Sequence, residues 1–227
     1  MPNALIFDVD GVLADTEPIA VRTLNQTFKE LCNIDLCDED SLAYMGATTQ
    51  KHMSGLVETF SLDADVNELI EHHESLFIKT ITQKSDLAIP ESISLLKRIA
   101  LDEEWSVGLA TSSTRNRSEE SIRACGIDET HLNAWLTGND ITKPKPNPEI
   151  YIACALSLGI PPNRCVVIED SVAGITAAKA AGMACIALEG TFPGEALREA
   201  DRIVDSLVNV DRTMLYDLIH EAAEATK

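Results

Sequence analysis

Two aspartates, Asp8 and Asp10, stand two residues apart directly behind the apolar run of residues 4–7. Successive side chains of a strand point to opposite faces, so residues two apart lie on the same side. Two carboxylates held this closely repel one another unless a cation lies between them. Gly11 follows them, and a glycine lets the backbone turn sharply without steric cost. The pattern predicts a strand that ends in an acidic, cation-binding turn.

Polar residues also follow two later apolar runs. Thr111 and Ser112 come after residues 107–110, and Glu169 and Asp170 come after residues 166–168. In doubly wound sheets, ligands bind outside the carboxyl ends of the strands. An all-oxygen set suits Mg²⁺, a hard cation that often binds substrate phosphate as well. Each acid taken alone is equally consistent with a helix cap or a solvated turn, but together they predict a magnesium site.

Two further features are suited to binding an anion. Thr111 and Ser112 precede a predicted helix start, where free N–H groups attract anions, although an ordinary N-cap is the alternative. Lys143 and Lys145 lie among alternating prolines, which hold the backbone extended. A lysine on such a rigid stem would neutralise a phosphoryl oxygen and the acids together. For either lysine, the alternative is a solvated loop residue.

The elements that would position these residues follow from the spacing of apolar residues. Short runs rich in β-branched residues alternate with helical patterns; they are residues 4–7, 106–110, 134–136, 165–168, 185–188 and 203–204. This alternation is typical of an α/β fold with a doubly wound, mostly parallel, Rossmann-like sheet.

The segment between the first and second strands has a different pattern. From residue 17 to residue 83 strand-like runs are missing, and apolar residues recur at helical intervals. His72 and His73 lie on this pattern, where surface and packing roles are expected rather than metal binding. Thr16 to Pro18 suits a helix start, and Pro90 suits the first turn of the next helix. We therefore predict a catalytic core of residues 1–15 and 87–227 and an all-helical cap domain of residues 16–86.

The net charge limits the classes of partner. The 18 Lys and Arg residues face 37 Asp and Glu residues, so the formal charge is −19. Such a chain repels nucleic acid and anionic membranes, and we expect it to bind neither. An anionic small substrate would need a bound cation and a few local bases. A substrate that carries phosphate would be subject to this constraint, and the expected state of the protein is a monomer.

The cysteines and the N-terminal residues bear on the compartment. Six cysteines occur without a Cys-x-x-Cys spacing, and most lie within apolar runs. Free thiols in such runs pack as small hydrophobes, which indicates a reducing cytosol. The first residues lack the features of an export signal, and no apolar run has the length of a membrane span. A cytoplasmic protein is expected.

Four motifs together resemble the haloacid dehalogenase-like phosphohydrolase superfamily, in its β-phosphoglucomutase-like branch. They are residues 8–15 (DVDGVLAD), Thr111, residues 145–151 (KPNPEIY) and residues 167–175 (VIEDSVAGI). The order and spacing of all four make the resemblance specific, and it extends over the whole chain, including the inserted cap. It implies an Mg²⁺-dependent phosphatase that acts on a small phosphorylated metabolite, such as a sugar phosphate, through an aspartyl-phosphate.

The resemblance also implies a role for each site residue. Asp8 would be the nucleophile, and Asp10 would protonate the leaving group and then deprotonate water. Thr111 and Ser112 would hold the phosphoryl oxygens. Lys145 would bind them and orient Asp8. Glu149 and Tyr151 follow Lys145 at the sequence spacing that the motif requires, whereas no acid and aromatic residue follow Lys143 at that spacing. The implied Mg²⁺ ligands are the side chains of Asp8 and Asp170, the carbonyl of Asp10 and, at or near the coordination shell, Glu169.

Departures from the family bear on the reaction. The histidine and the arginine that β-phosphoglucomutases carry on the cap are replaced by Ala20 and Thr49, which favours a hydrolase over a sugar phosphomutase. Lys51 is expected at the surface rather than as the Schiff-base lysine of phosphonatases, because Asp10 is present. A catalytically silent binding protein with this fold is the third possibility. We expect residues 44–50 and those just after Thr16 to determine substrate specificity. These residues do not identify the substrate.

Overall fold

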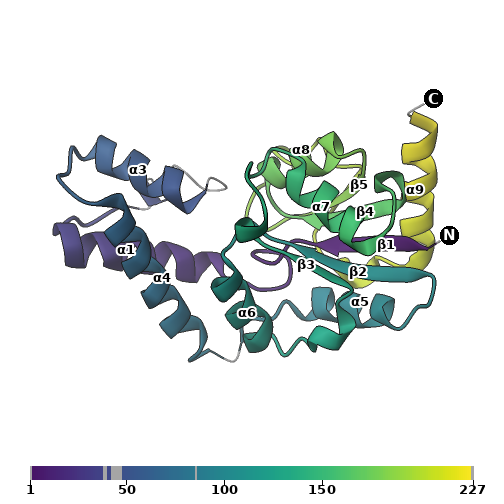
Figure 1. Ribbon diagram of the computed structural model, residues 1–227, viewed down its shortest axis with the longest axis horizontal. Coiled ribbons are helices and arrows are strands. Elements are labelled where there is room, and N and C mark those ends of the chain that lie inside the picture. The colour runs from purple at the N-terminus through teal and green to yellow at the C-terminus, as the bar shows by residue number, and fades with distance from the viewer. Residues whose placement is uncertain (1, 38–39, 42–47, 85, 226–227) are drawn as a thin grey trace.

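The computed structural model describes residues 2–37, 40–41, 48–84 and 86–225, and its sheet is built from parallel strands (Figure 1). The strands run in the order β3-β2-β1-β4-β5-β6. Their bounds are β1 Asn3–Phe7, β2 Trp105–Ala110, β3 Ala134–Leu136, β4 Cys165–Glu169, β5 Ala184–Leu188 and β6 Arg202–Val204. Each strand coincides with a predicted run to within a residue at either end, which confirms the α/β fold.

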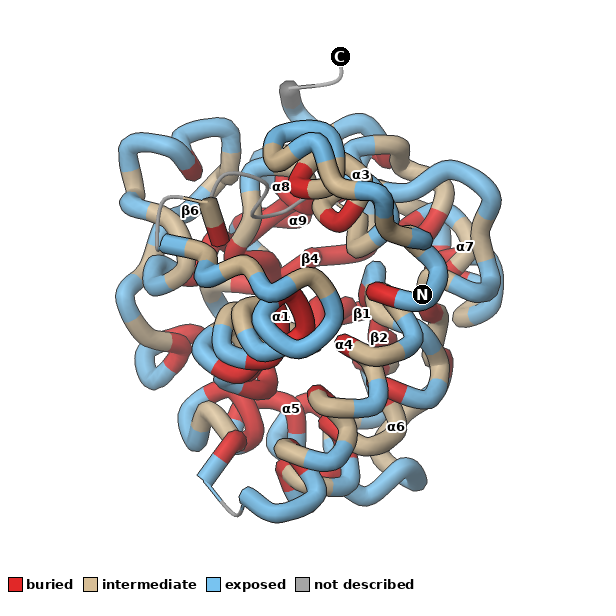
Figure 2. Tube along the Cα trace, turned by 90° about the vertical axis from the view of Figure 1, so that its left-hand side faces the viewer, coloured by how far each residue is buried: buried red, intermediate tan, exposed pale blue. Residues whose placement is uncertain are grey.

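Helices cover both faces of the sheet, because both sets of strand side chains are apolar. The bounds are α5 Pro90–Ala100, α6 Arg115–Ala124, α7 Glu149–Leu158, α8 Val172–Ala180 and α9 Arg212–Ala225. Leu5 and Phe7 of β1 belong to the same buried cluster as residues of α5, α6 and α9, whereas Ala4 and Ile6 pack with α7 and α8. The central strands are therefore buried on both faces, as the red segments of Figure 2 show.

Short helices fill several of the loops. They are η1 Glu129–His131, η2 Gly138–Asp140, η3 Pro162–Arg164 and η4 Leu207–Asn209. Side-chain caps fix the starts of the helices that follow β2 and β4. Thr114 accepts a hydrogen bond from the backbone N–H of Arg117, and Ser171 accepts one from that of Gly174. Among the helices of the described ranges, none combines the length and apolarity that crossing a membrane requires.

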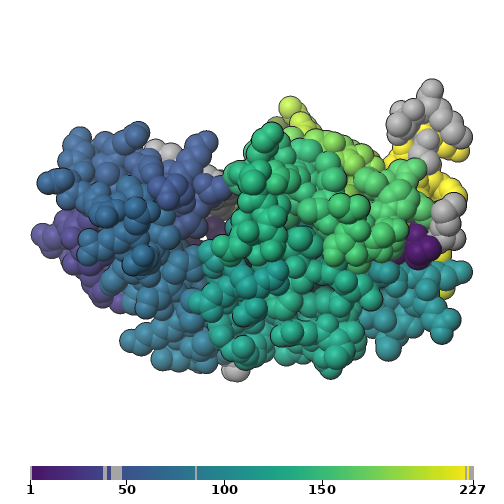
Figure 3. Space-filling view, in the orientation of Figure 1, coloured from purple at the N-terminus to yellow at the C-terminus, as the bar shows by residue number. Residues whose placement is uncertain are grey.

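The described helices between β1 and α5 form a lobe at one end of the molecule (Figures 1 and 3). They are α1 Glu17–Cys32, α3 Thr49–Thr59 and α4 Val66–Ile81. The lobe has a buried cluster of its own, made by Leu24, Phe28, Met53, Leu56 and Leu69. All of these helices lie within residues 16–86, and assignment of that segment as a cap domain stays a prediction.

The chain leaves the sheet and returns to it at the same place. The backbone N–H of Asp15 donates to the carbonyl of Leu87 at 2.8 Å, and that of Ile89 donates to the carbonyl of Leu13 at 3.0 Å. The two connections thus run side by side in opposite directions, paired through a bridge between Ala14 and Ala88. The helical lobe therefore joins the core at one double-stranded neck.

Candidate active site

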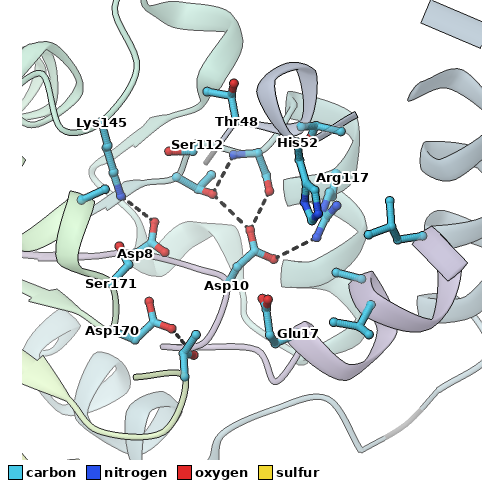
Figure 4. A pocket seen from close by; sticks show the side chains of 18 of the residues that line it. Asp8, Asp10, Glu17, Thr48, His52, Ser112, Arg117, Lys145, Asp170 and Ser171 are labelled. Atoms are coloured by element: carbon cyan, nitrogen blue, oxygen red, sulfur yellow. Dashed lines mark hydrogen bonds and ion pairs between the residues drawn. The ribbon is translucent and has the colours of Figure 1, made fainter. Parts of the chain in front are cut away.

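The predicted site residues meet at the carboxyl ends of three neighbouring strands. Asp8 follows β1, Thr111 follows β2, and Asp170 follows β4, and these strands are adjacent in the sheet. Together with Asp10 and Lys145 they line one cavity of about 180 Å³, as Figure 4 shows for the labelled side chains. The reversal of strand order at β1 opens this crevice, as in other doubly wound sheets.

Three buried carboxylates form the floor of the site. One oxygen from each of Asp8, Glu169 and Asp170 lies within 4.8 Å of the other two. Burial raises the pKa of Asp8 to about 7 even though Lys145 lowers it, and burial together with the charges of Glu169 and Asp8 raises the pKa of Asp170. Like charges this close favour a cation between them.

Lys145 lies over this cluster and is almost fully buried, with 6% of its side chain exposed. Its Nζ is 2.9 Å from Oδ1 of Asp8, 2.7 Å from Oε1 of Glu169 and 3.1 Å from the carbonyl of Ala110. These negative partners outweigh desolvation and raise the pKa of Lys145, so the ammonium stays charged. The side chain therefore holds the Asp8 carboxylate in place.

The proline-rich loop presents this lysine because Glu149 fixes its other end. The Glu149 carboxylate accepts hydrogen bonds from the backbone N–H groups of Thr142 and Lys143 at 2.8 and 3.0 Å. Lys143 is exposed. The structure thus brings Lys145, and not Lys143, to Asp8.

Glu169 is completely buried, and hydrogen-bond donors surround it. Oε1 accepts from Lys145 and, at 2.7 Å, from the Tyr151 hydroxyl. Oε2 accepts from the backbone N–H groups of Asp170 and Ser171 and from the Ser171 hydroxyl. Burial alone would raise the pKa of Glu169, but Lys145 and these hydrogen bonds hold it below its usual range. Both oxygens are occupied by protein donors.

Asp10 is held by a second set of donors. Thr16 and Ser113 each donate to its carboxylate at 2.6 Å, Thr111 lies at 3.4 Å, and Arg117 Nη2 lies 3.9 Å from Oδ1. Burial opposes ionisation, but Arg117 and these hydroxyls lower the pKa of Asp10. The carboxylate is therefore ionised and fixed in direction.

Sequence reasoning identified some of these donors and missed others. Thr111 is buried beside Asp10, whereas Ser112 lines the cavity with an exposed side chain. Ser113, which we did not predict, makes the short bond to Asp10. Thr16 was expected only as a helix start, yet its hydroxyl bonds to Asp10 and makes no side-chain cap. Arg117 was also missed, since an arginine in a helical first turn carries no signal of burial.

The helical lobe contributes the opposite wall of the cavity. Glu17 and Ala20 of α1, Thr49 and His52 of α3, and His73 of α4 line it. Of the segment expected to set specificity, Tyr44–Ala47 lies outside the described residues. Lys51 is exposed, as expected.

The residues present fit a hard divalent cation. Among the described residues, Lys145 donates the one hydrogen bond to the Asp8 carboxylate, and Thr191 donates the one hydrogen bond to the Asp170 carboxylate. Each carboxylate thus keeps an oxygen available as a ligand, and Mg²⁺ prefers one or two carboxylates together with water and substrate phosphate. Glu169 offers less, because its oxygens already accept five hydrogen bonds.

Known proteins are similar to this chain in sequence and in fold. The chain is 28% identical over 232 residues to the protein SUPPRESSOR OF QUENCHING 1, chloroplastic, of Arabidopsis thaliana, covering 99% of this chain and 21% of that relative. The chain thus spans about a fifth of that relative's length. It is 27% identical over 224 residues to the phosphorylated carbohydrates phosphatase of Thermotoga maritima, covering 94% of this chain and 100% of the relative.

A solved structure and a family profile agree with these relatives. The crystal structure of CbbY from Rhodobacter sphaeroides in complex with phosphate superposes with a TM-score of 0.86 at 26% identity, covering 95% of this chain and 100% of that one. The profile of the haloacid dehalogenase-like hydrolases matches residues 5–188. The protein described here is a member of the haloacid dehalogenase-like hydrolase family.

Proposed function

We propose that this protein is an Mg²⁺-dependent phosphatase that hydrolyses a sugar phosphate, or a similar small phosphorylated metabolite, through an aspartyl-phosphate intermediate. The observation that carries the proposal is the position of Lys145, whose ammonium contacts Asp8 at the floor of the cavity. A relative of full length is named a phosphorylated carbohydrates phosphatase, which supports the substrate class.

The first step uses Asp8 as the nucleophile. A carboxylate oxygen of Asp8 attacks phosphorus, and the bond between phosphorus and the sugar oxygen breaks. Lys145 orients Asp8 and, with Thr111, offers hydrogen bonds to the phosphoryl oxygens. When bound by Asp8 and Asp170, Mg²⁺ would offset the negative charge of the phosphoryl group. Covalent transfer to Asp8 divides one difficult displacement into two easier ones.

Asp10 moves the proton in both steps. It is ionised in the structure, and the charge of a phosphate bound next to it would raise its pKa and favour protonation. Asp10 then gives the proton to the departing sugar oxygen. In the second step it takes a proton from water, whose oxygen attacks phosphorus and releases inorganic phosphate and free Asp8.

The double-stranded neck at Asp15 and Leu87 supports a division into core and cap. We propose that the boundaries lie at residues 15–16 and 86–87, and that closure of the cap excludes water before transfer. We also propose a reducing, cytoplasmic location. All of the cysteines are free thiols, and Cys125, Cys154, Cys165 and Cys185 are buried.

A sugar phosphomutase is the nearest rival, since it would use the same aspartyl-phosphate. Ala20 and Thr49 both line the cavity and provide no cationic side chain for a second phosphate. A silent binding protein is disfavoured because the nucleophile, Lys145 and Asp170 are all in place. These points favour hydrolysis.

A screen of phosphorylated metabolites with Mg²⁺, comparing the native protein with Asp8→Asn, tests the proposal. Release of phosphate that the substitution abolishes supports a phosphatase. Isomerisation that depends on an added bisphosphate would instead identify a mutase. If no compound is turned over, both enzymatic readings are wrong.

A further inference from the structure

Arg117 is a buried arginine at the wall between the core and the helical lobe. It lies in the first turn of α6 and is 8% exposed. Its Cζ is 3.4 Å from the ring centroid of Phe77 on α4, so the aromatic ring covers one face of the guanidinium. Stacking of this kind leaves the N–H donors at the edge of the guanidinium free to bind other groups.

Those donors are poorly used by the protein. Its ionic partner among the described residues is Asp10, whose Oδ1 is 3.9 Å from Nη2, which is beyond hydrogen-bond distance. The Nε atom is buried and has no hydrogen-bond partner among the described residues. Since Arg117 lines the cavity and points toward Asp10 in Figure 4, its donors are available to a bound molecule.

His73 on α4 has the complementary property. Its Nε2 lies 3.3 Å from the carbonyl of Ala20, a contact that requires Nε2 to carry the proton. Its Nδ1 is then an acceptor, and within the described part of the chain this buried atom has no partner. His73 is 5% exposed and lines the same cavity as Arg117. Buried groups without partners are costly, so each favours a ligand that completes its hydrogen bonds.

The charges around Arg117 restrict what that ligand can be. The carboxyl groups of Asp10, Glu17 and Glu74 all lie near the guanidinium. Burial raises the pKa of Glu17 and Glu74 and the charge of Arg117 opposes that rise, whereas at Asp10 Arg117 and the hydroxyl donors outweigh burial and lower the pKa. One positive charge therefore faces several negative ones, and a further anion would be repelled. A hydroxyl group has no such penalty, because it can accept from Arg117 and donate to His73 or Glu17.

We propose that Arg117 and His73 determine specificity by binding hydroxyl groups of a neutral polyol, so that the substrate carries one phosphate and no other acidic group. This inference rests on the proposed phosphatase function. Arg117 lies next to Asp10, which serves the leaving group, and the hydroxyls in question are therefore those of the leaving sugar.

The native protein provides the first test. Sorbitol 6-phosphate and 6-phosphogluconate share a six-carbon skeleton, and the second adds a carboxylate. We expect kcat/KM to be at least about tenfold higher for sorbitol 6-phosphate. Its polyol gains one charge-assisted hydrogen bond that the carboxylate compound lacks, and a bond of that kind corresponds to a ratio of this size. The value of kcat/KM should likewise be higher for fructose 1-phosphate than for fructose 1,6-bisphosphate. A preference for the acidic member of either pair would overturn the proposal without affecting the phosphatase function.

Substitution then tests the residues. Arg117→Gln should lower kcat/KM for sorbitol 6-phosphate by about ten to one hundredfold, mainly through KM. For p-nitrophenyl phosphate, which lacks hydroxyls, the loss in kcat/KM should be smaller, because only the effect of Arg117 on Asp10 is then removed. His73→Gln should show the same selective loss. Arg115→Gln is the matched control, since Arg115 lies in the same turn but pairs with Asp140.

Two outcomes of these substitutions contradict the inference, and a third result removes its basis. Equal losses on both substrates would mean that Arg117 acts structurally or only through Asp10. An unchanged KM for sorbitol 6-phosphate in both variants would exclude a role in binding hydroxyls. Absence of Mg²⁺-dependent phosphate release from every compound, including p-nitrophenyl phosphate, would instead remove the phosphatase function on which the inference depends.

Discussion

The Nζ atom of Lys145 lies 2.7 Å from Oε1 of Glu169, and both side chains are removed from solvent. Glu169 therefore balances the charge that Lys145 directs at Asp8. A buried ion pair is stable only when hydrogen bonds satisfy its remaining atoms, and Tyr151 and Ser171 supply them here. This relationship gives Glu169 a function that does not require contact with a metal.

Replacing Glu169 by glutamine is the first prediction. The amide keeps the shape of the side chain but removes the charge that holds Lys145, so we expect kcat to fall by about 10²-fold. The Mg²⁺ concentration that gives half of the maximal rate should change by less than about threefold, because Glu169 already accepts five hydrogen bonds. Initial rates over a magnesium titration measure both quantities.

Asp170→Asn is the matched comparison. Asp170 keeps an oxygen available as a ligand, so its variant should need at least about tenfold more Mg²⁺ for half of its maximal rate. If the two variants exchange these behaviours, Glu169 is a metal ligand and the account above is wrong.

Tyr151→Phe is the second prediction and concerns stability. The buried hydroxyl donates to the Glu169 carboxylate at 2.7 Å, and a hydrogen bond to a charged group contributes about 1.5–3 kcal/mol. We expect the free energy of unfolding to fall by about that amount in urea denaturation. Tyr216→Phe removes an exposed hydroxyl that donates to Glu104 and should cost less than about 0.5 kcal/mol. Equal effects at the two positions would show that the Glu169 network adds nothing.

The third prediction concerns the pH dependence of stability. Burial, reinforced by the charge of Arg117, lowers the pKa of His73 from 6.5 to about 3. Between these values the unfolded chain binds a proton that the folded protein does not, so folding becomes less favourable as pH falls. This destabilisation of the folded protein by His73 is absent above about pH 6.5. Below that pH the free energy of unfolding falls by up to about 1.4 kcal/mol per pH unit.

Urea unfolding of the native protein and His73→Gln between pH 4.5 and 8 isolates this effect, because other titrating groups cancel in the difference. The native protein should lose its advantage in free energy of unfolding over the variant as pH falls, because the variant has no imidazole that takes up a proton on unfolding. The same substitution at the exposed His220 serves as the control. A difference that stays constant with pH would mean that His73 binds its proton equally well in the folded and the unfolded protein.

The fourth prediction separates two neighbouring serines. Ser113 donates to Asp10 at 2.6 Å, whereas Ser112 is exposed at the mouth of the cavity. Ser113→Ala should lower kcat/KM by about tenfold, since one hydrogen bond that fixes the proton-transfer group is lost. Ser112→Ala should change it by less than about threefold. Steady-state kinetics on one substrate suffices, and the reverse order would restore Ser112 to the role predicted from the sequence.

The sheet could be predicted because its signal is local. Each central strand is a short apolar run between turn residues, and a strand buried on both faces has no other composition. The motifs then placed Asp8, Asp10, Thr111 and Asp170 at strand ends, where the structure has them around one cavity.

The parts that were missed depend on contacts between distant segments. Arg117 is buried because α4 places Phe77 over it, and nothing near Arg117 in sequence encodes that contact. Thr16 has the residue type of an N-cap, but the return of the turn after β1 brings its hydroxyl to Asp10 instead. Glu169 was predicted only at or near the metal coordination shell, and its contact with Lys145 was missed, since both roles need a carboxylate at the same strand end.

The paired backbone segments at Asp15 and Leu87 have a consequence for how this architecture diversifies. The helical lobe begins and ends at adjacent points. The core therefore does not have to order a long loop to join the two ends. A replacement segment of different length needs only two termini about a strand spacing apart. The lobe can therefore be replaced by a different segment while Asp8, Thr111 and Asp170, which directly follow strands of the sheet, keep their positions.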